Sequence, residues 1–262
     1  MQNIDAYRLK WIAVTGMFLN HVAMALREVV PFALQFPLYA AGGLTFPIMA
    51  FLAVEGYRRT SDLKKYLLRL LAFGLVAQVP YMAAFREYGF ALNIMFTIAL
   101  GILLLLLYDR MKTRILFGAI FALALVASMA FDWAVIGIIM MLLYRAIPGE
   151  SKRRILPGVA SGIFYAAFVG IAALNLHRMS SDPGAEELVA QFEASFMGME
   201  MLLPALAFPV GMFAAAFLLK GYSGERGKPM KYFFYVFYPL HLAVLAGIAL
   251  ALGLADPSAL GL

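Results

Sequence analysis

The sequence predicts an all-α, polytopic membrane protein, a single bundle of about nine transmembrane helices that takes up residues 1–262. Three observations indicate this class. Hydrophobic residues make up 64% of the chain and charged residues 14%, whereas soluble domains average roughly 45–50% and 25%. The apolar residues gather in segments of the length needed to cross a bilayer. The basic residues concentrate in alternate connections between these segments.

Nine apolar segments follow one another and define the expected helices. They lie near residues 11–27, 38–57, 66–85, 90–108, 114–131, 133–147, 155–176, 202–220 and 232–254. A transmembrane helix needs about 20 apolar residues, and the sixth segment is short by this measure. The N-terminus has no cleavable signal pattern, so we expect the first segment to remain as a membrane helix.

Basic residues bound these segments on one side of the predicted membrane. They precede the first segment and then separate segments two and three, four and five, six and seven, and eight and nine: Arg8, Lys10, Arg58, Arg59, Lys64, Lys65, Arg110, Lys112, Arg114, Arg145, Lys152, Arg153, Arg154, Lys220, Arg226, Lys228 and Lys231. This side holds 17 of the 21 basic residues. The positive-inside rule therefore predicts a cytoplasmic N-terminus and an outer C-terminus. The net charge of +6 is then mainly a topology signal, and we expect no nucleic-acid partner.

One long outer connection, at about residues 177–201, differs from the rest in being acidic. It carries Asp182, Glu186, Glu187, Glu193 and Glu200, and its apolar residues Leu188, Phe192, Phe196 and Met199 recur at helical intervals. The pattern favours an interfacial helix on the outer leaflet. A lid, or a docking platform for a partner outside the cell, is the alternative.

Lys10 and His21 lie eleven residues apart on the first segment, which is the most informative spacing in the chain. Eleven steps of about 100° return to the same helix face, and a rise of about 1.5 Å per residue places His21 about 16 Å beyond Lys10. With Lys10 at one interface, His21 reaches the middle of a core about 30 Å thick. An ionisable side chain at that depth indicates a functional site, so His21 is the first candidate catalytic residue.

His241 reaches a similar depth on the ninth segment, because it lies ten residues, or about 15 Å, beyond Lys231. A membrane histidine also serves as a hydrogen bond between helices, so both roles stay open for His241. The other polar or tyrosine side chains of interest within the segments are Asn20, Gln78, Tyr81, Asn93, Thr97 and Tyr238. Gln78, Asn93 and Thr97 are expected mainly as structural contacts.

A second concentration of polar residues lies at the cytoplasmic end of segments two and three. It consists of Glu55, Arg58, Arg59, Lys64, Lys65 and Arg69. Arg69 lies within the third segment, and we expect it to pair with Glu55. The positive-inside rule explains most of these charges, but guanidinium and ammonium groups here would also bind a polyanion from the cytoplasm. No phosphate-binding glycine loop of the Walker type is present, and the absence of cysteine excludes thiolate catalysis.

Five segments together resemble the TraX family of membrane proteins: LKWIAVTGMFLNHVAMAL, FPIMAFLAVEGYRRT, KKYLLRLLAFGLVAQVPY, ALNIMFTIALG and YFFYVFYPLHL. The resemblance covers most of the chain and implies a bacterial plasma membrane protein associated with acetylation of the pilin N-terminus. It also implies a relation to transmembrane acyltransferases, including acyltransferase family three and the heparan-acetylating enzymes. Those relatives carry a basic residue, ten intervening residues and a histidine on their first helix, as Lys10 and His21 do here. An aspartate commonly precedes that histidine, whereas this chain has Asn20.

The resemblance implies an acetyltransferase that uses cytoplasmic acetyl-CoA as its donor and needs no metal. The phosphates of the donor would lie among Arg58, Arg59, Lys65 and Arg69, near Lys10, and the thioester would reach His21. His21 would act as general base or accept the acetyl group itself, with Asn20 orienting its ring. Oxyanion or substrate contacts would come from His241, Gln78, Tyr81, Asn93 and Tyr238.

The acceptor stays open: a pilin N-terminus, an envelope glycan, a membrane lipid and a small amine all fit the chain. Two other functions also stay open. Buried histidines in a bundle suit a proton-coupled small-molecule transporter, and a non-catalytic assembly protein of a pilus or secretion system needs neither donor nor solute. Stabilisation by coenzyme A separates the enzyme from both.

Overall fold

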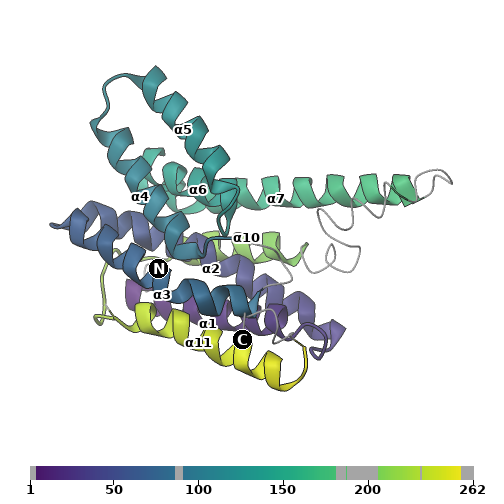
Figure 1. Ribbon diagram of the computed structural model, residues 1–262. Coiled ribbons are helices and arrows are strands. Elements are labelled where there is room, and N and C mark those ends of the chain that lie inside the picture. Colours follow the sequence, from purple (N-terminus) through teal and green to yellow (C-terminus); the bar gives the residue numbers. More distant parts are fainter. Residues whose placement is uncertain (1–3, 86–90, 181–186, 188–205, 231, 255–262) are drawn as a thin grey trace.

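The computed structural model is all-helical and describes residues 4–85, 91–180, 187, 206–230 and 232–254 (Figure 1). Nine helices fall within these residues: α1 (Ala6–Ala25), α2 (Phe32–Arg59), α3 (Leu63–Ala84), α4 (Ile94–Arg110), α5 (Arg114–Ser128), α6 (Ala134–Ala146), α7 (Glu150–Ser180), α10 (Ala207–Lys220) and α11 (Phe233–Ala251). Each coincides with one predicted segment, so the predicted all-helical class is confirmed. The number of membrane spans and their orientation stay predictions.

The helices differ in their capacity to cross a membrane. Among the described residues, α2, α3, α7 and α11 are long and apolar enough to do so. The shortest helix, α6, has 13 residues and a length of about 20 Å, which is less than the roughly 30 Å of a hydrocarbon core. Most of the predicted outer connection, 177–201, lies outside the described residues, although α7 extends to Ser180.

Polar side chains fix where three helices begin. Oδ1 of Asp5 accepts the backbone N–H of Arg8 at 2.8 Å, and Oδ1 of Asp62 accepts that of Lys65 at 2.9 Å. These bonds satisfy donors that the first turn of a helix leaves unpaired. Asn93 caps α4 in the same way. The starts of these three helices therefore follow from local sequence.

Close packing of α2 against two neighbours forms the centre of the bundle. α2 packs most extensively on α10 and α1, α3 packs on α11, and α7 packs on α10. Figure 1 shows α1, α2, α3 and α11 side by side, while α4, which packs on α3 and α6, forms with α5 a hairpin that projects from the bundle. The backbones approach closely at glycines, because a Cβ on Gly211 would overlap the carbonyl oxygen of Ala40 and one on Gly43 would overlap that of Phe208. Small residues allow this approach between membrane helices.

Large apolar side chains point outward from several helices. On α3, Leu75 and Val79 are 66% and 73% exposed, and on α5 Ile115 and Leu123 are 88% and 72% exposed. Water-soluble proteins rarely expose continuous apolar surface of this kind. These helix faces are therefore suited to contact membrane lipids.

Two ends of the bundle carry different connections. We call the end where α2 finishes and α1, α3 and α7 begin the basic end, because Arg58, Arg59, Arg153 and Arg154 lie there. At the opposite end, the α3–α4 and α5–α6 connections pair with each other through the bridge between Leu92 and Phe131. Of the residues that the sequence singles out, Asn93 lies at this opposite end, and the others lie at the basic end or on the helices between the two ends.

Candidate functional site

Two buried histidines from distant parts of the sequence are in direct contact. Nδ1 of His21, on α1, lies 2.8 Å from Nε2 of His241, on α11. The two rings are nearly parallel, with an interplanar angle of 3°, and the residues are 8% and 5% exposed. The predicted similarity in depth is therefore confirmed.

The hydrogen bonds determine which nitrogen of each neutral ring carries a proton. Nδ1 of His241 lies 2.8 Å from the carbonyl oxygen of Phe237, which can only accept, so Nδ1–H is the donor. Nε2 of His241 is then unprotonated and accepts from Nδ1–H of His21. Nε2 of His21 keeps its lone pair, and no described residue donates a hydrogen bond to it. The arrangement presents one basic nitrogen.

Aromatic rings surround the two histidines. The ring of His21 lies 4.9 Å from that of Phe85 and 6.2 Å from that of Tyr238, while His241 lies 4.7 Å from Phe237 and 6.3 Å from Phe18, measured between centroids. Such an enclosure limits the access of water to a reacting group. Tyr238 is the predicted substrate-contacting residue that the structure brings next to both histidines.

Lys10 and Asn20 lie on different sides of α1. Nζ of Lys10 lies 5.8 Å from the ring centroid of Phe234 on α11, so Lys10 and His21 contact the same helix, as their spacing predicts. Asn20 instead packs against Gly42 of α2, and its Nδ2 lies 3.3 Å from Sδ of Met24. Adjacent residues on a helix point about 100° apart, and the structure does not bring Asn20 to the histidine pair.

Gln78 and Asn93 bind each other rather than the histidines. Nδ2 of Asn93 donates to Oε1 of Gln78 at 2.9 Å and to the carbonyl oxygen of Gly74 at 2.7 Å. Nε2 of Gln78 donates to the carbonyl oxygen of Ala91 at 2.8 Å, and Oδ1 of Asn93 accepts from the backbone of Met95. These bonds hold the α3–α4 connection and cap α4. Their amide groups therefore have protein partners in this structure, and their oxyanion contacts stay a prediction.

Asp132 is a polar group near the site that the sequence reasoning missed. It lies in the tight α5–α6 connection, where its N–H donates to the carbonyl oxygen of Leu92 at 2.7 Å and its own carbonyl accepts from Oγ1 of Thr97. Burial raises the pKa of Asp132 to about 7, and its carboxylate is close enough to act electrostatically on Tyr81 and Tyr238. Asp132 is therefore a charged neighbour of the tyrosines that the sequence predicts as substrate contacts.

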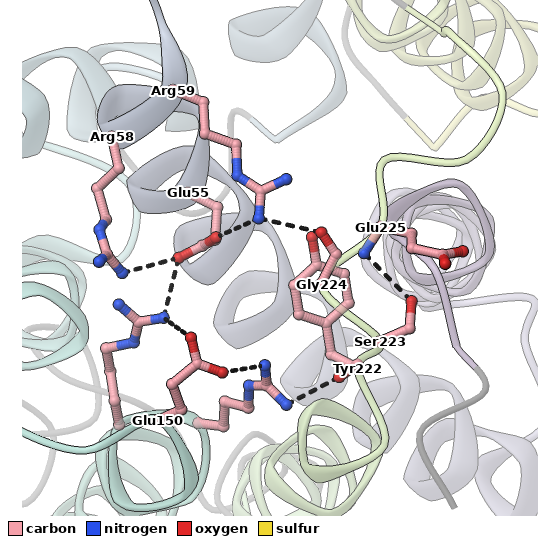
Figure 2. Close-up of polar contacts among 10 residues, drawn as sticks. Glu55, Arg58, Arg59, Glu150, Tyr222, Ser223, Gly224 and Glu225 are labelled. Carbon is pink, nitrogen blue, oxygen red and sulfur yellow. Dashed lines mark hydrogen bonds and ion pairs between the residues drawn. The ribbon is translucent and has the colours of Figure 1, made fainter.

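The predicted donor-binding arginines meet Glu55 at the basic end. Figure 2 shows Arg58 and Arg59 directed at its carboxylate from the same helix. The nitrogen–oxygen distances are 3.3 Å for Arg58 and 3.0 Å for Arg59, which also donates to the carbonyl oxygen of Gly224. Arg153 of α7 adds a third contact at 3.1 Å. The expectation that Arg69 pairs with Glu55 is therefore wrong, because these three arginines take up its carboxylate.

Lys65 and Arg69 lie apart from that cluster. Nζ of Lys65 lies 3.0 Å from Oδ2 of Asp62, and hydrogen bonds from the backbone and side chain of Lys65 lower the pKa of the Asp62 carboxyl. The guanidinium of Arg69 lies 6.0 Å from the ring centroid of Tyr66, and its buried Nε has no hydrogen-bond partner among the described residues. The five predicted donor contacts thus fall into separate groups: Arg58 with Arg59, Lys65 with Arg69, and Lys10 beside α11.

Metal coordination has no support within the part of the chain that the structure describes, because no group of three or more His, Asp or Glu residues could hold an ion there.

The residues near the site that the sequence did not predict had weak sequence signals. Arg153 reads as one more positive-inside charge, and Asp132 as a single acid between two apolar segments. Phe237 contributes a backbone carbonyl, which no side-chain pattern identifies.

Comparison with known proteins gives two matches over nearly the whole chain. The family model described as "TraX protein" matches residues 6–249. A protein of Dichelobacter nodosus named "Probable fimbrial assembly protein FimC, serogroup H1" is 31% identical, and the match covers 93% of this chain and 96% of that protein. No solved structure matches the chain.

Proposed function

This chain belongs to the TraX family, and on that premise we propose that it is an integral membrane acetyltransferase acting in pilus biogenesis. It takes an acetyl group from acetyl-CoA and delivers it to an amine or hydroxyl at the membrane. The observation that carries the proposal is the hydrogen-bonded chain from the Phe237 carbonyl through His241 to His21. Of the two unprotonated imidazole nitrogens in this buried, aromatic site, Nε2 of His21 is the one to which no described residue donates a hydrogen bond.

His21 Nε2 is the reacting atom in this proposal. It takes the proton of the acceptor amine or hydroxyl while the acceptor nitrogen or oxygen attacks the thioester carbonyl carbon. The carbon–sulfur bond then breaks, and the departing thiolate of coenzyme A takes the proton from Nε2 of His21. In the covalent variant Nε2 attacks the carbonyl carbon first and the carbon–sulfur bond breaks. The acceptor then attacks the acetyl carbon, the bond from that carbon to Nε2 breaks, and the proton of the acceptor passes to the thiolate. Both variants need the lone pair on Nε2.

Two residues next to His21, His241 and Tyr238, have supporting roles in the proposal. His241 is a positioning residue, because its contact with His21 fixes the tautomer of that ring. Tyr238 has a buried hydroxyl beside the backbone of Ile94, and its ring centroid lies 6.2 Å from that of His21. In this proposal it stabilises negative charge on the thioester oxygen.

The name of the related protein favours pilus assembly as the setting, and an assembly protein without catalytic activity is the second candidate. Transfer of radiolabelled acetyl from acetyl-CoA separates the two. We expect membranes that contain the protein to label an envelope component, and H21Q to abolish the labelling while H177Q, which changes the third histidine of the chain, leaves it intact. Labelling that H21Q does not change would contradict the proposal, and an absence of labelling by the unaltered protein in membranes from pilus-forming cells would favour the non-catalytic role.

A further inference from the structure

Two consecutive arginines in the first turn of α7 are buried at the basic end. The side chains of Arg153 and Arg154 are 9% and 6% exposed. A guanidinium group removed from water is costly unless it is paired and fully hydrogen-bonded. Arg154 meets this condition largely through Glu150 and the carbonyl oxygen of Tyr222. Arg153 meets it less well, since its close partner is Glu55, already shared with other arginines.

Cations outnumber carboxylates in this network. Four guanidinium groups and two carboxylates are connected by the ion pairs among Glu55, Arg58, Arg59, Glu150, Arg153 and Arg154. Glu150 is 70% exposed, so water screens much of its charge. The Nε atoms of Arg153 and Arg154 are buried and have no hydrogen-bond partner within the described residues. The network therefore holds more positive charge than its own acids neutralise.

We propose that Arg58, Arg59 and Arg153 form a binding site for a phosphate-bearing anion around Glu55. Planar guanidinium groups bind phosphate oxygens with two parallel hydrogen bonds. The N-terminus of α7 adds a partial positive charge on the same side. Arg58 and Arg59 are 42% and 51% exposed and give access from the aqueous side, while Arg153 forms the buried wall.

The site deepens the donor half of the proposed function, and only the identity of the ligand rests on that function. It assigns Arg153, not Lys65 or Arg69, as the partner of Arg58 and Arg59. The shared ligand chemistry is a phosphate group, which either a nucleotide coenzyme or an anionic lipid headgroup supplies. The rings of Trp11, Phe233 and Phe237 contact one another in succession from the basic end toward His241. The acyl-bearing arm of a coenzyme would extend along these rings.

A purely structural role is the competing explanation. The ion pair between Glu55 and Arg153 connects α2 to α7, and the hydrogen bond from Arg59 connects α2 to the carbonyl oxygen of Gly224 (Figure 2). The two explanations predict different results when the charge of Glu55 is removed. In an anion site, Glu55 repels the phosphate and occupies the guanidinium groups, so E55Q should strengthen binding. If the role is purely structural, E55Q lowers the stability of the protein and creates no affinity for phosphate.

The experiment measures binding to the full-length protein in neutral detergent by titration calorimetry, with coenzyme A, adenosine 3′,5′-bisphosphate and inorganic pyrophosphate as probes. We expect R153Q to raise Kd about tenfold, which corresponds to one charge-assisted contact, and E55Q to lower it severalfold. R114Q is the matched control, because Arg114 is a cation of α5 that binds the carbonyl oxygen of Tyr108 outside the network. R114Q should change Kd less than about twofold.

Parallel thermal unfolding in nanodiscs of anionic or zwitterionic lipid distinguishes the sources of phosphate. Stabilisation by anionic lipid that R153Q removes and R114Q retains, without binding of the soluble probes, assigns the site to a headgroup. The proposal is overturned if R153Q and R114Q weaken binding equally, or if the unaltered protein responds to none of the probes or lipids. If E55Q does not fold, R58Q replaces it, and unchanged Kd in folded R58Q also overturns the proposal. H21Q should bind normally, so loss of acetyl transfer with intact binding would count against the proposed function alone.

Discussion

At the residue scale, His241 replaces the carboxylate that commonly orients a catalytic histidine. A neutral imidazole can accept the Nδ1–H of His21 only because the Phe237 carbonyl holds the proton of His241 on its own Nδ1. Asn20, the residue next to His21 in sequence, faces α2 and does not take this role. The orienting group therefore comes from the other end of the chain.

The first prediction concerns the tautomers of these rings. In H177Q protein with ¹⁵N-labelled histidine, nitrogen NMR should show Nδ1 protonated and Nε2 unprotonated in both remaining rings. H241F removes the acceptor of the His21 proton, so His21 should then populate both tautomers and acetyl transfer should fall about 10²–10⁴-fold. H241Q offers an amide oxygen and should recover part of the activity. An Nε2-protonated His21 in the unaltered pair would rule out its role as the base.

The second prediction concerns the carboxyl of Asp132, whose pKa burial raises to about 7 from an ordinary 3.8. Between these values the folded protein holds a proton that the unfolded chain releases, so this group makes stability fall as pH rises from about 4 to 7. D132N cannot titrate, and its melting temperature relative to the unaltered protein should increase from pH 5 to pH 8. D62N is the control: the pKa of Asp62 is lowered, so its effect should be constant in this range. A constant effect of D132N would contradict the assignment.

At the element scale, contact between backbones sets the positions of α1, α2 and α10. Gly211 of α10 lies against the carbonyl of Ala40, with no room for a Cβ atom. Because α2 carries Glu55 and packs on α1, which carries His21, a shift of α10 against α2 would disturb the surroundings of both residues. This coupling comes from packing, which the apolar pattern of the sequence does not specify.

The third prediction tests this packing with a matched pair of glycines. G211A should displace α10 and lower the melting temperature, as overpacking costs about 1–3 kcal/mol. Gly118 of α5 has open space around its Cα, so G118A should be neutral or stabilise the helix by about 0.5–1 kcal/mol. Thermal unfolding in one detergent measures both. Equal effects of the two variants would show that the α2–α10 contact does not limit stability.

At the scale of the whole molecule, the sequence predicts the order of the helices that the described residues contain, because apolar length is a local property. It also predicts that His21 and His241 lie at equal depth, since depth follows from residue count along a helix. The pairing of Glu55 with Arg153 could not be predicted in this way, because it depends on how α2 and α7 pack across 98 residues of sequence. The hydrogen bonds by which Gln78 and Asn93 hold the α3–α4 connection could not be predicted either, because they depend on the folded conformation of that connection.

Mass spectrometry of envelope proteins, glycans and lipids tests the central claim most directly. Cells that lack the protein would be complemented with the unaltered chain, with H21Q or with H177Q, each at equal abundance in the membrane. We expect one envelope component to carry an acetyl group with the unaltered chain and with H177Q, and to lack it with H21Q. The same acetylated component in cells complemented with H21Q would show that acetyl transfer does not need His21, against the proposed function.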